Sequence, residues 1–157
     1  MARQNLIANL QYSWEPFTLD EHHLTFAEHV SARLERGRCS CWGPAVYKWE
    51  GIVRSGVHAG KRAVLIGETG DLRQRIKQYV SGTQERGNKL WRETFLTLSD
   101  ARLFTLNLAS FAVSGRESID LSQVFFSNNV RVVLEQLLIM QAVAEADNSR
   151  WVVNARQ

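Results

Sequence analysis

Apolar and polar positions repeat with two different periods along the chain, and the changes of period outline the predicted elements. Residues 20–37 place apolar side chains every three or four positions after an Asp20 cap, which predicts an amphipathic helix that ends at Gly37. Residues 44–51 and 62–67 have the pattern of two short strands. The glycine-rich stretch between them predicts a long hairpin connection, so the two strands are expected to be neighbours.

The second half of the chain predicts mainly helices. The turn ETGD caps a helix that ends near Gly82, and its buried stripe is Leu72, Ile76, Tyr79 and Val80. Residues 88–98 predict a second short helix, and residues 101–109 predict a third strand. Residues 127–147 predict a long capped helix, and residues 150–157 an edge strand.

These elements predict an α/β fold of the α+β kind, with a small, mainly antiparallel three-stranded sheet flanked by helices. The 157 residues suit one compact domain, in which residues 1–40 form an N-terminal helical extension and residues 41–157 carry the sheet. Cys39 and Cys41 are too close and too few for a four-ligand zinc site, so we interpret them as reduced structural thiols.

Charge is distributed unevenly although the formal net charge is only +3. Residues 48–93 hold ten Lys/Arg and five Asp/Glu, whereas the segments before and after each sum to −1. A local positive surplus favours a polyanion such as nucleic acid, and a solvated basic face is the alternative. No apolar run is long enough to span a membrane and no signal peptide is evident, so we expect a cytoplasmic protein with no membrane partner.

Two local patterns draw attention within this framework. Arg75 precedes Tyr79 by four residues, so both lie in one row at the edge of the helix stripe. The long helix is apolar on nearly every side from Val132 to Met140, which predicts burial, yet it contains Glu135. A buried carboxylate needs a cation or a partner, and the simplest partner is Arg131, four residues earlier.

The order of these features resembles the GIY-YIG nuclease family. The family's first tripeptide reads Ala45, Val46, Tyr47 here, and its second reads Leu65, Ile66, Gly67. The segment GETGDLRQRI aligns Arg75 with the family arginine, and LEQLLI aligns Glu135 with the family glutamate.

The resemblance implies an endonuclease that hydrolyses DNA phosphodiester bonds, with double-stranded DNA favoured, and that uses Mg²⁺ or Mn²⁺ bound by Glu135. Arg75 would bind phosphate, while Tyr47 would orient and deprotonate water, assisted by Tyr79. Two further positions match the family pattern, Gly67 and Asn154. The charges expected to contact phosphate are Lys61, Arg62, Arg73, Lys77, Lys89 and Arg92.

Each of these residues also has a structural interpretation. The second tripeptide carries Leu65 where the family has tyrosine, so the alternative is a degenerate member that binds nucleic acid or protein without cutting. Tyr47 is equally compatible with a core position, and Asn154 with a turn. A third alternative is an unrelated α/β module whose basic surface has no partner.

Overall fold

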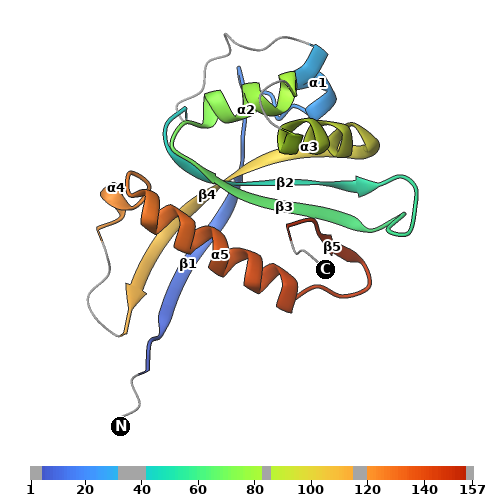
Figure 1. The fold of residues 1–157 in the computed structure, drawn as a ribbon. Coiled ribbons are helices and arrows are strands. Elements are labelled where there is room, and N and C mark those ends of the chain that lie inside the picture. Colours follow the sequence, from blue (N-terminus) through green and yellow to red (C-terminus); the bar gives the residue numbers. More distant parts are fainter. Residues whose placement is uncertain (1–4, 32–41, 83–85, 115–119, 155–157) are drawn as a thin grey trace.

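The computed structural model describes residues 5–31, 42–82, 86–114 and 120–154, which form a five-stranded sheet with helices on both faces (Figure 1). The strands are β1 (Ala8–Pro16), β2 (Ala45–Val53), β3 (Arg62–Thr69), β4 (Leu98–Val113) and β5 (Arg150–Val152). The helices are α1 (Phe26–Ser31), α2 (Leu72–Ser81), α3 (Arg86–Thr97), α4 (Leu121–Val124) and α5 (Asn128–Ala144). The α/β class predicted from the sequence is confirmed.

The sheet is larger than predicted, and it is mixed. Its order is β1-β4-β2-β3-β5, with antiparallel pairing throughout except between β3 and β5. The prediction of three strands was wrong because β4 is 16 residues long, so that its first half pairs with β2 and its second half pairs with β1. The strand β1 belongs to the segment that we expected to be a helical extension.

The first helix begins later than its hydrophobic period predicted. Asp20 and Glu21 adopt left-handed backbone angles, φ 48° and 68°, which a helix does not accommodate. The helix starts at Phe26 instead, where the Thr25 side chain and Glu28 form a capping box. The remainder of that predicted helix, together with Cys39 and Cys41, lies outside the described residues.

Strand alternation divides the core into two clusters on opposite faces of the sheet. Tyr47 and Trp49 point to the face covered by α1, α2 and α3, where they pack with Phe26, Ile76 and Phe95. Val46 points the other way and joins the second cluster, which includes side chains of α5 such as Leu134, Leu138 and Ala142. In Figure 1, α5 crosses one face of the sheet and α2 and α3 lie across the other. The two faces therefore carry separate layers of helices.

The long helix α5 is only half-buried, contrary to the prediction. Leu134 and Leu138 are buried against the sheet, but Val133 and Met140 are 50% and 67% exposed. The apolar character all round the helix suggested burial on all sides, whereas the described chain covers one side alone. In the described part of the chain, no helix combines the length and apolar character that crossing a membrane requires.

His29 provides a pH test of the first core cluster. Its side chain is buried between Phe17 and Trp49, and its Nε2 atom has no hydrogen-bond partner among the described residues. Burial lowers the pKa of His29 from 6.5 to about 4.

Between pH 6.5 and about pH 4, this histidine is therefore protonated in the unfolded chain and neutral in the folded chain. The free energy of unfolding should fall as pH drops from 6.5 towards 4, by up to about 3 kcal/mol. Urea melts across this range should show a shallower pH dependence for His29→Leu, whereas the exposed His22→Leu should match the wild type. Equal pH dependence in all three proteins would contradict the buried neutral histidine.

Candidate functional site

The edge of β3 that faces away from β2, here called its outer edge, has different hydrogen-bond partners along its length. β5 pairs with it from Arg62 to Val64, and the Val153 N–H donates to the Val64 carbonyl at 2.8 Å. Beyond that point, the Asn154 side chain accepts from the Ile66 N–H and donates to the Ile66 carbonyl, both at 2.7 Å. Asn154 thus extends the pairing of a strand that has ended. Its role in the described structure is to hold this edge.

Tyr47, Tyr79 and Arg75 form one hydrogen-bonded group beside this edge, on the α2 side of the sheet. The Arg75 Nε–H donates to the Tyr47 hydroxyl at 3.0 Å, and the Tyr47 and Tyr79 hydroxyl oxygens are 2.7 Å apart. The guanidinium carbon lies 4.5 Å from the centre of the Tyr79 ring. Arg75 also donates to the Gln78 side chain at 3.1 Å. The i, i+4 spacing predicted from the sequence does bring Arg75 and Tyr79 together.

Both tyrosines are inside the protein. Tyr47 is 1% exposed and Tyr79 is 2% exposed. Burial raises the pKa of the Tyr47 hydroxyl well above 10, and burial likewise raises the pKa of Tyr79. A phenol that stays protonated is unsuited to removing a proton from water at neutral pH. The geometry instead makes the two tyrosines a support for the half-buried Arg75.

Gly67 makes room for this group. It lies opposite Tyr47 in the β2–β3 register, and a Cβ atom on it would lie 2.4 Å from the Tyr47 hydroxyl oxygen. Leu65 is buried in the same core cluster as Tyr47, 3% exposed. Gly67 thus has a steric role, while Leu65 is part of the core.

Glu135 reaches the same edge from the other face of the sheet. The helix that carries Glu135 lies on the face opposite to Tyr47, because the buried side of α5 packs with Val46 and Ile66. Burial raises the pKa of Glu135, as does the nearby carboxylate of Glu68, whereas the Glu68 backbone amide and Arg75 lower it. Arg75 and Glu135 are therefore close enough to interact electrostatically although their helices lie on opposite faces.

The simplest structural interpretation paired Arg131 with Glu135, and the structure shows a different partner for Arg131. Its Nε–H donates to Glu68 at 2.8 Å, and its other donors bind the Phe125 carbonyl and the Asn128 side chain. The Arg131 side chain is 8% exposed, so this ion pair is largely withdrawn from water. Within the described residues the Glu135 carboxylate accepts a hydrogen bond from the side-chain amide of Gln136, at 3.4 Å.

The predicted phosphate contacts divide into two groups. Arg73, Lys77, Lys89 and Arg92 lie on α2 and α3, on the Arg75 side of the sheet. Arg92 donates to the Val80 carbonyl at 2.8 Å, which joins the end of α2 to α3, and Arg73 stacks on Trp42. Lys61 and Arg62 lie at the opposite end of β3 from Gly67, about 17 Å away, and Arg62 pairs with Glu50.

Among the described residues, no group of three or more His, Cys, Asp or Glu side chains could enclose a metal ion. Within the described residues a metal site would therefore consist of one or two carboxylates, with water and phosphate as the other ligands, which is how Mg²⁺ usually binds. Glu135 is compatible with that mode, because it is half-buried and its pKa is raised, first by burial and further by the carboxylate of Glu68, whose repulsion a cation would relieve.

Sequence reasoning missed two residues of this region and gave a third the wrong partner. Glu68 and Gln78 contact or perturb the predicted residues, and Arg131 pairs with Glu68 instead of Glu135. Glu68 directly follows Gly67 in the sequence, so its place next to a predicted site residue could have identified it as a candidate. The pairing of Glu68 with Arg131 spans 63 positions and depends on how α5 packs against β3.

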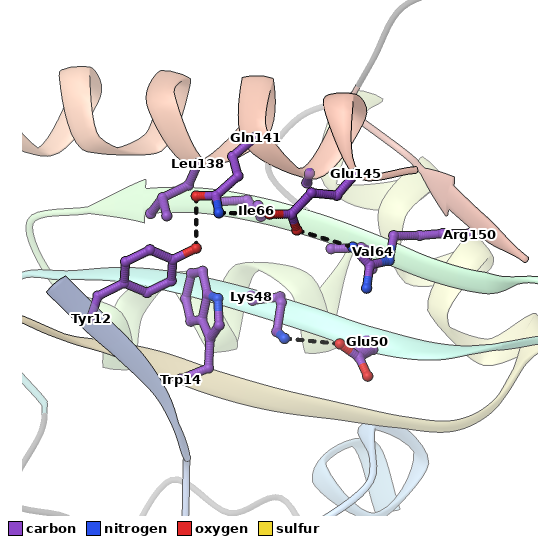
Figure 2. A pocket seen from close by; sticks show the side chains of 11 residues that line it. Tyr12, Trp14, Lys48, Glu50, Val64, Ile66, Leu138, Gln141, Glu145 and Arg150 are labelled. Carbon is purple, nitrogen blue, oxygen red and sulfur yellow. Dashed lines mark hydrogen bonds and ion pairs between the residues drawn. The ribbon is translucent and has the colours of Figure 1, made fainter. Parts of the chain in front are cut away.

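A separate concavity of about 170 Å³ lies on the α5 face of the sheet (Figure 2). Its charges neutralise one another, because Lys48 pairs with Glu50 at 2.9 Å and Arg150 lies 3.8 Å from Glu145. The Tyr12 hydroxyl donates to Gln141 across the opening at 2.9 Å. None of the residues predicted for the site lines this concavity.

The comparisons with known proteins add no relative to this picture. No family model, no curated protein and no solved structure matches the chain.

The steric role of Gly67 yields a direct test. In Gly67→Ala the new methyl group would overlap the Tyr47 hydroxyl, so either the ring or β3 must shift. We expect a loss of about 1–3 kcal/mol in the free energy of unfolding, measured by urea denaturation. Gly43→Ala is the matched control, because a Cβ there meets nothing within 4 Å. If the two variants are equally stable, Tyr47 is not held against β3 as described.

Proposed function

We propose that this protein is a metal-dependent endonuclease of the GIY-YIG type, which hydrolyses phosphodiester bonds in DNA. The observation that carries the proposal is that Arg75 and Glu135, on helices that cover opposite faces of the sheet, lie close enough at the outer edge of β3 to interact electrostatically. Phosphodiester hydrolysis uses a cationic group that binds phosphate and a carboxylate that can hold a metal ion.

Arg75 is the phosphate-binding residue in this proposal. Its guanidinium is permanently charged and planar, and it matches the spacing of two phosphate oxygens. Tyr47 holds the guanidinium by accepting a hydrogen bond, and Tyr79 holds it by stacking. Because both tyrosines are buried and neutral, they act as positioning residues that fix the direction of the guanidinium.

Glu135 would hold Mg²⁺ or Mn²⁺. When bound, the cation neutralises charge on the phosphate and makes water more acidic. Glu68 is the nearest second carboxylate, and its ion pair with Arg131 keeps it in a fixed place next to Glu135. The ion pair leaves Glu68 partly neutralised, so Glu135 is the stronger of the two ligands.

The DNA would approach the α2 and α3 side of this edge. Arg73, Lys77 and Lys89 lie on these helices and would position a duplex through its phosphates without reading its sequence. Lys61 and Arg62 are too far along β3 to contact the same phosphates, although a longer duplex would reach them.

A second candidate function is DNA binding without cleavage. Two observations favour it: Leu65 fills the core where the family has tyrosine, and the remaining tyrosines are buried with raised pKa values. In that case Arg75 and the basic residues of α2 would bind phosphate while Glu135 held no metal.

Glu135→Gln separates the two functions. The amide keeps the shape of the side chain but is a poor ligand for Mg²⁺, so nicking of supercoiled plasmid with Mg²⁺ or Mn²⁺ should fall by at least about 100-fold. Stability should not decrease, since the buried charge is removed. DNA binding, followed by fluorescence anisotropy, should persist.

Glu145→Gln is the matched control, because this glutamate caps the same helix and is exposed. It should nick as the wild type does. A wild-type protein that binds DNA but nicks nothing with either metal would support the binding function, and a Glu135→Gln variant as active as the wild type would exclude Glu135 from the site.

A further inference from the structure

The connection between β2 and β3 is a basic surface at the end of this strand pair, next to β5 (Figure 1). Residues 51–67 contain no Asp or Glu, and their Lys and Arg residues are Arg54, Lys61 and Arg62. Arg62 pairs with Glu50 at 2.6 Å. Within the described parts of the chain, Arg54 and Lys61 form no ion pair. The connection therefore keeps positive charge that its neighbours do not cancel.

This connection has a fixed shape. The Gly60 N–H donates to the Val53 carbonyl at 2.8 Å, and the Lys61 N–H donates to the His58 carbonyl at 3.0 Å. The His58 ring stacks on the Trp151 ring of β5, with centroids 4.5 Å apart and an angle of 11° between the planes. The stacking ties the connection to β5. Lys61 is thus presented by an ordered turn, which reduces the entropy that binding a partner would cost.

Lys61 lies on the same face of the sheet as Arg75. Trp151 packs against the core cluster that contains Tyr47, the residue that holds Arg75. Ala63 pairs with Trp151 and belongs to the same cluster. Side chains alternate between faces along a strand, so Lys61, two positions before Ala63, points to this face as well.

The stretch of edge between Lys61 and the Arg75 group carries no carboxylate. Gly67 lies opposite Tyr47 and is six positions from Lys61, which is about 20 Å along an extended strand. Residues 63–67 of β3 and residues 151–154 beside them are all uncharged. A phosphate backbone that followed this edge would meet positive charge at both ends and no acidic side chain between them.

We propose that the connection between β2 and β3 is a second phosphate contact for duplex DNA, which runs along the outer edge of β3 from Arg75 to Lys61. This inference rests on the proposed function and specifies its substrate. At about 3.4 Å per base pair, the duplex must extend at least about six base pairs beyond the phosphate held by Arg75. Duplex DNA is stiff over this length, so a duplex parallel to β3 necessarily passes the connection.

Lys61→Gln removes one charge from the second contact. The plot of log affinity against log salt concentration should become shallower by about 0.9, and affinity for a duplex of about 16 base pairs should fall about 5–10-fold at about 0.1 M salt. Fluorescence anisotropy measures both quantities. Arg150→Gln is the matched control, because Arg150 directly precedes Trp151 but lines the concavity on the α5 face, and it should bind as the wild type does.

The length of the duplex tests its direction. The ratio of wild-type to Lys61→Gln affinity should be near one for a stem-loop of about five base pairs, which is too short to join the two contacts, and should reach its full value at about ten base pairs. A ratio that is independent of length would exclude a duplex that runs along β3.

His58 is a positioning residue in this proposal. His58→Ala should weaken binding of the longer duplex because it releases the connection from Trp151, whereas His58→Phe keeps a stacked ring and should bind within about twofold of the wild type. Melting curves of both variants verify that they are folded. If His58→Ala binds as tightly as the wild type, the stacking does not position the contact.

The outcomes separate this inference from the proposed function. Equal salt dependence for wild type and Lys61→Gln, or an equal loss in Arg150→Gln, would overturn the second contact and leave the nuclease proposal standing. A wild type that shows the Lys61 dependence but never nicks DNA would support the contact and refute cleavage. A wild type that does not bind duplex DNA at low salt would overturn both.

Discussion

Backbone groups on the outer edge of β3 need partners beyond the point where β5 ends, and this requirement organises the candidate site. β5 supplies three residues of pairing, and the Asn154 side chain then satisfies both backbone groups of Ile66. The next outward-facing amide belongs to Glu68, and it acts on Glu135 from α5. Among the described residues no strand covers this last part of the edge, and helices from the two faces of the sheet bring side chains near it.

The two halves of the site are held by different physical means. On one face, Gly67 allows Tyr47 to lie close to β3, and the two buried tyrosines fix Arg75 by a hydrogen bond and ring contact. On the other face, the largely buried ion pair between Arg131 and Glu68 fixes the Glu68 carboxylate beside Glu135. Burial, and to a smaller extent this carboxylate, raises the pKa of Glu135. Breaking a buried pair is costly, so Arg131 ties the register of α5 to that of β3. The site thus depends on core packing on both faces.

Short-range patterns in the sequence predicted the helix α2 and the contact between its side chains. Asp71 caps α2, Gly82 ends it in a left-handed conformation, and the four-residue spacing places Arg75 on Tyr79. The sheet was underestimated because β1 and β4 pair across about 100 positions, which no local period reveals. The pairing of Arg131 with Glu68, rather than with its helix neighbour Glu135, was missed for the same reason. The exposure of Val133 and Met140 on α5 was not predicted, because apolar residues on every side of a helix suggest burial on every side.

In the proposed function, the outer edge of β3 brings a phosphate-binding arginine, Arg75, close to a metal-binding carboxylate, Glu135. Paramagnetic broadening by Mn²⁺, recorded by NMR with a short DNA duplex of uncleavable backbone, measures this most directly. The amide signals of Glu68 and Glu135 should broaden most, and Glu135→Gln should abolish the effect. Broadening centred on the Glu50 and Glu145 concavity, or broadening that Glu135→Gln leaves unchanged, would exclude a metal site at this edge.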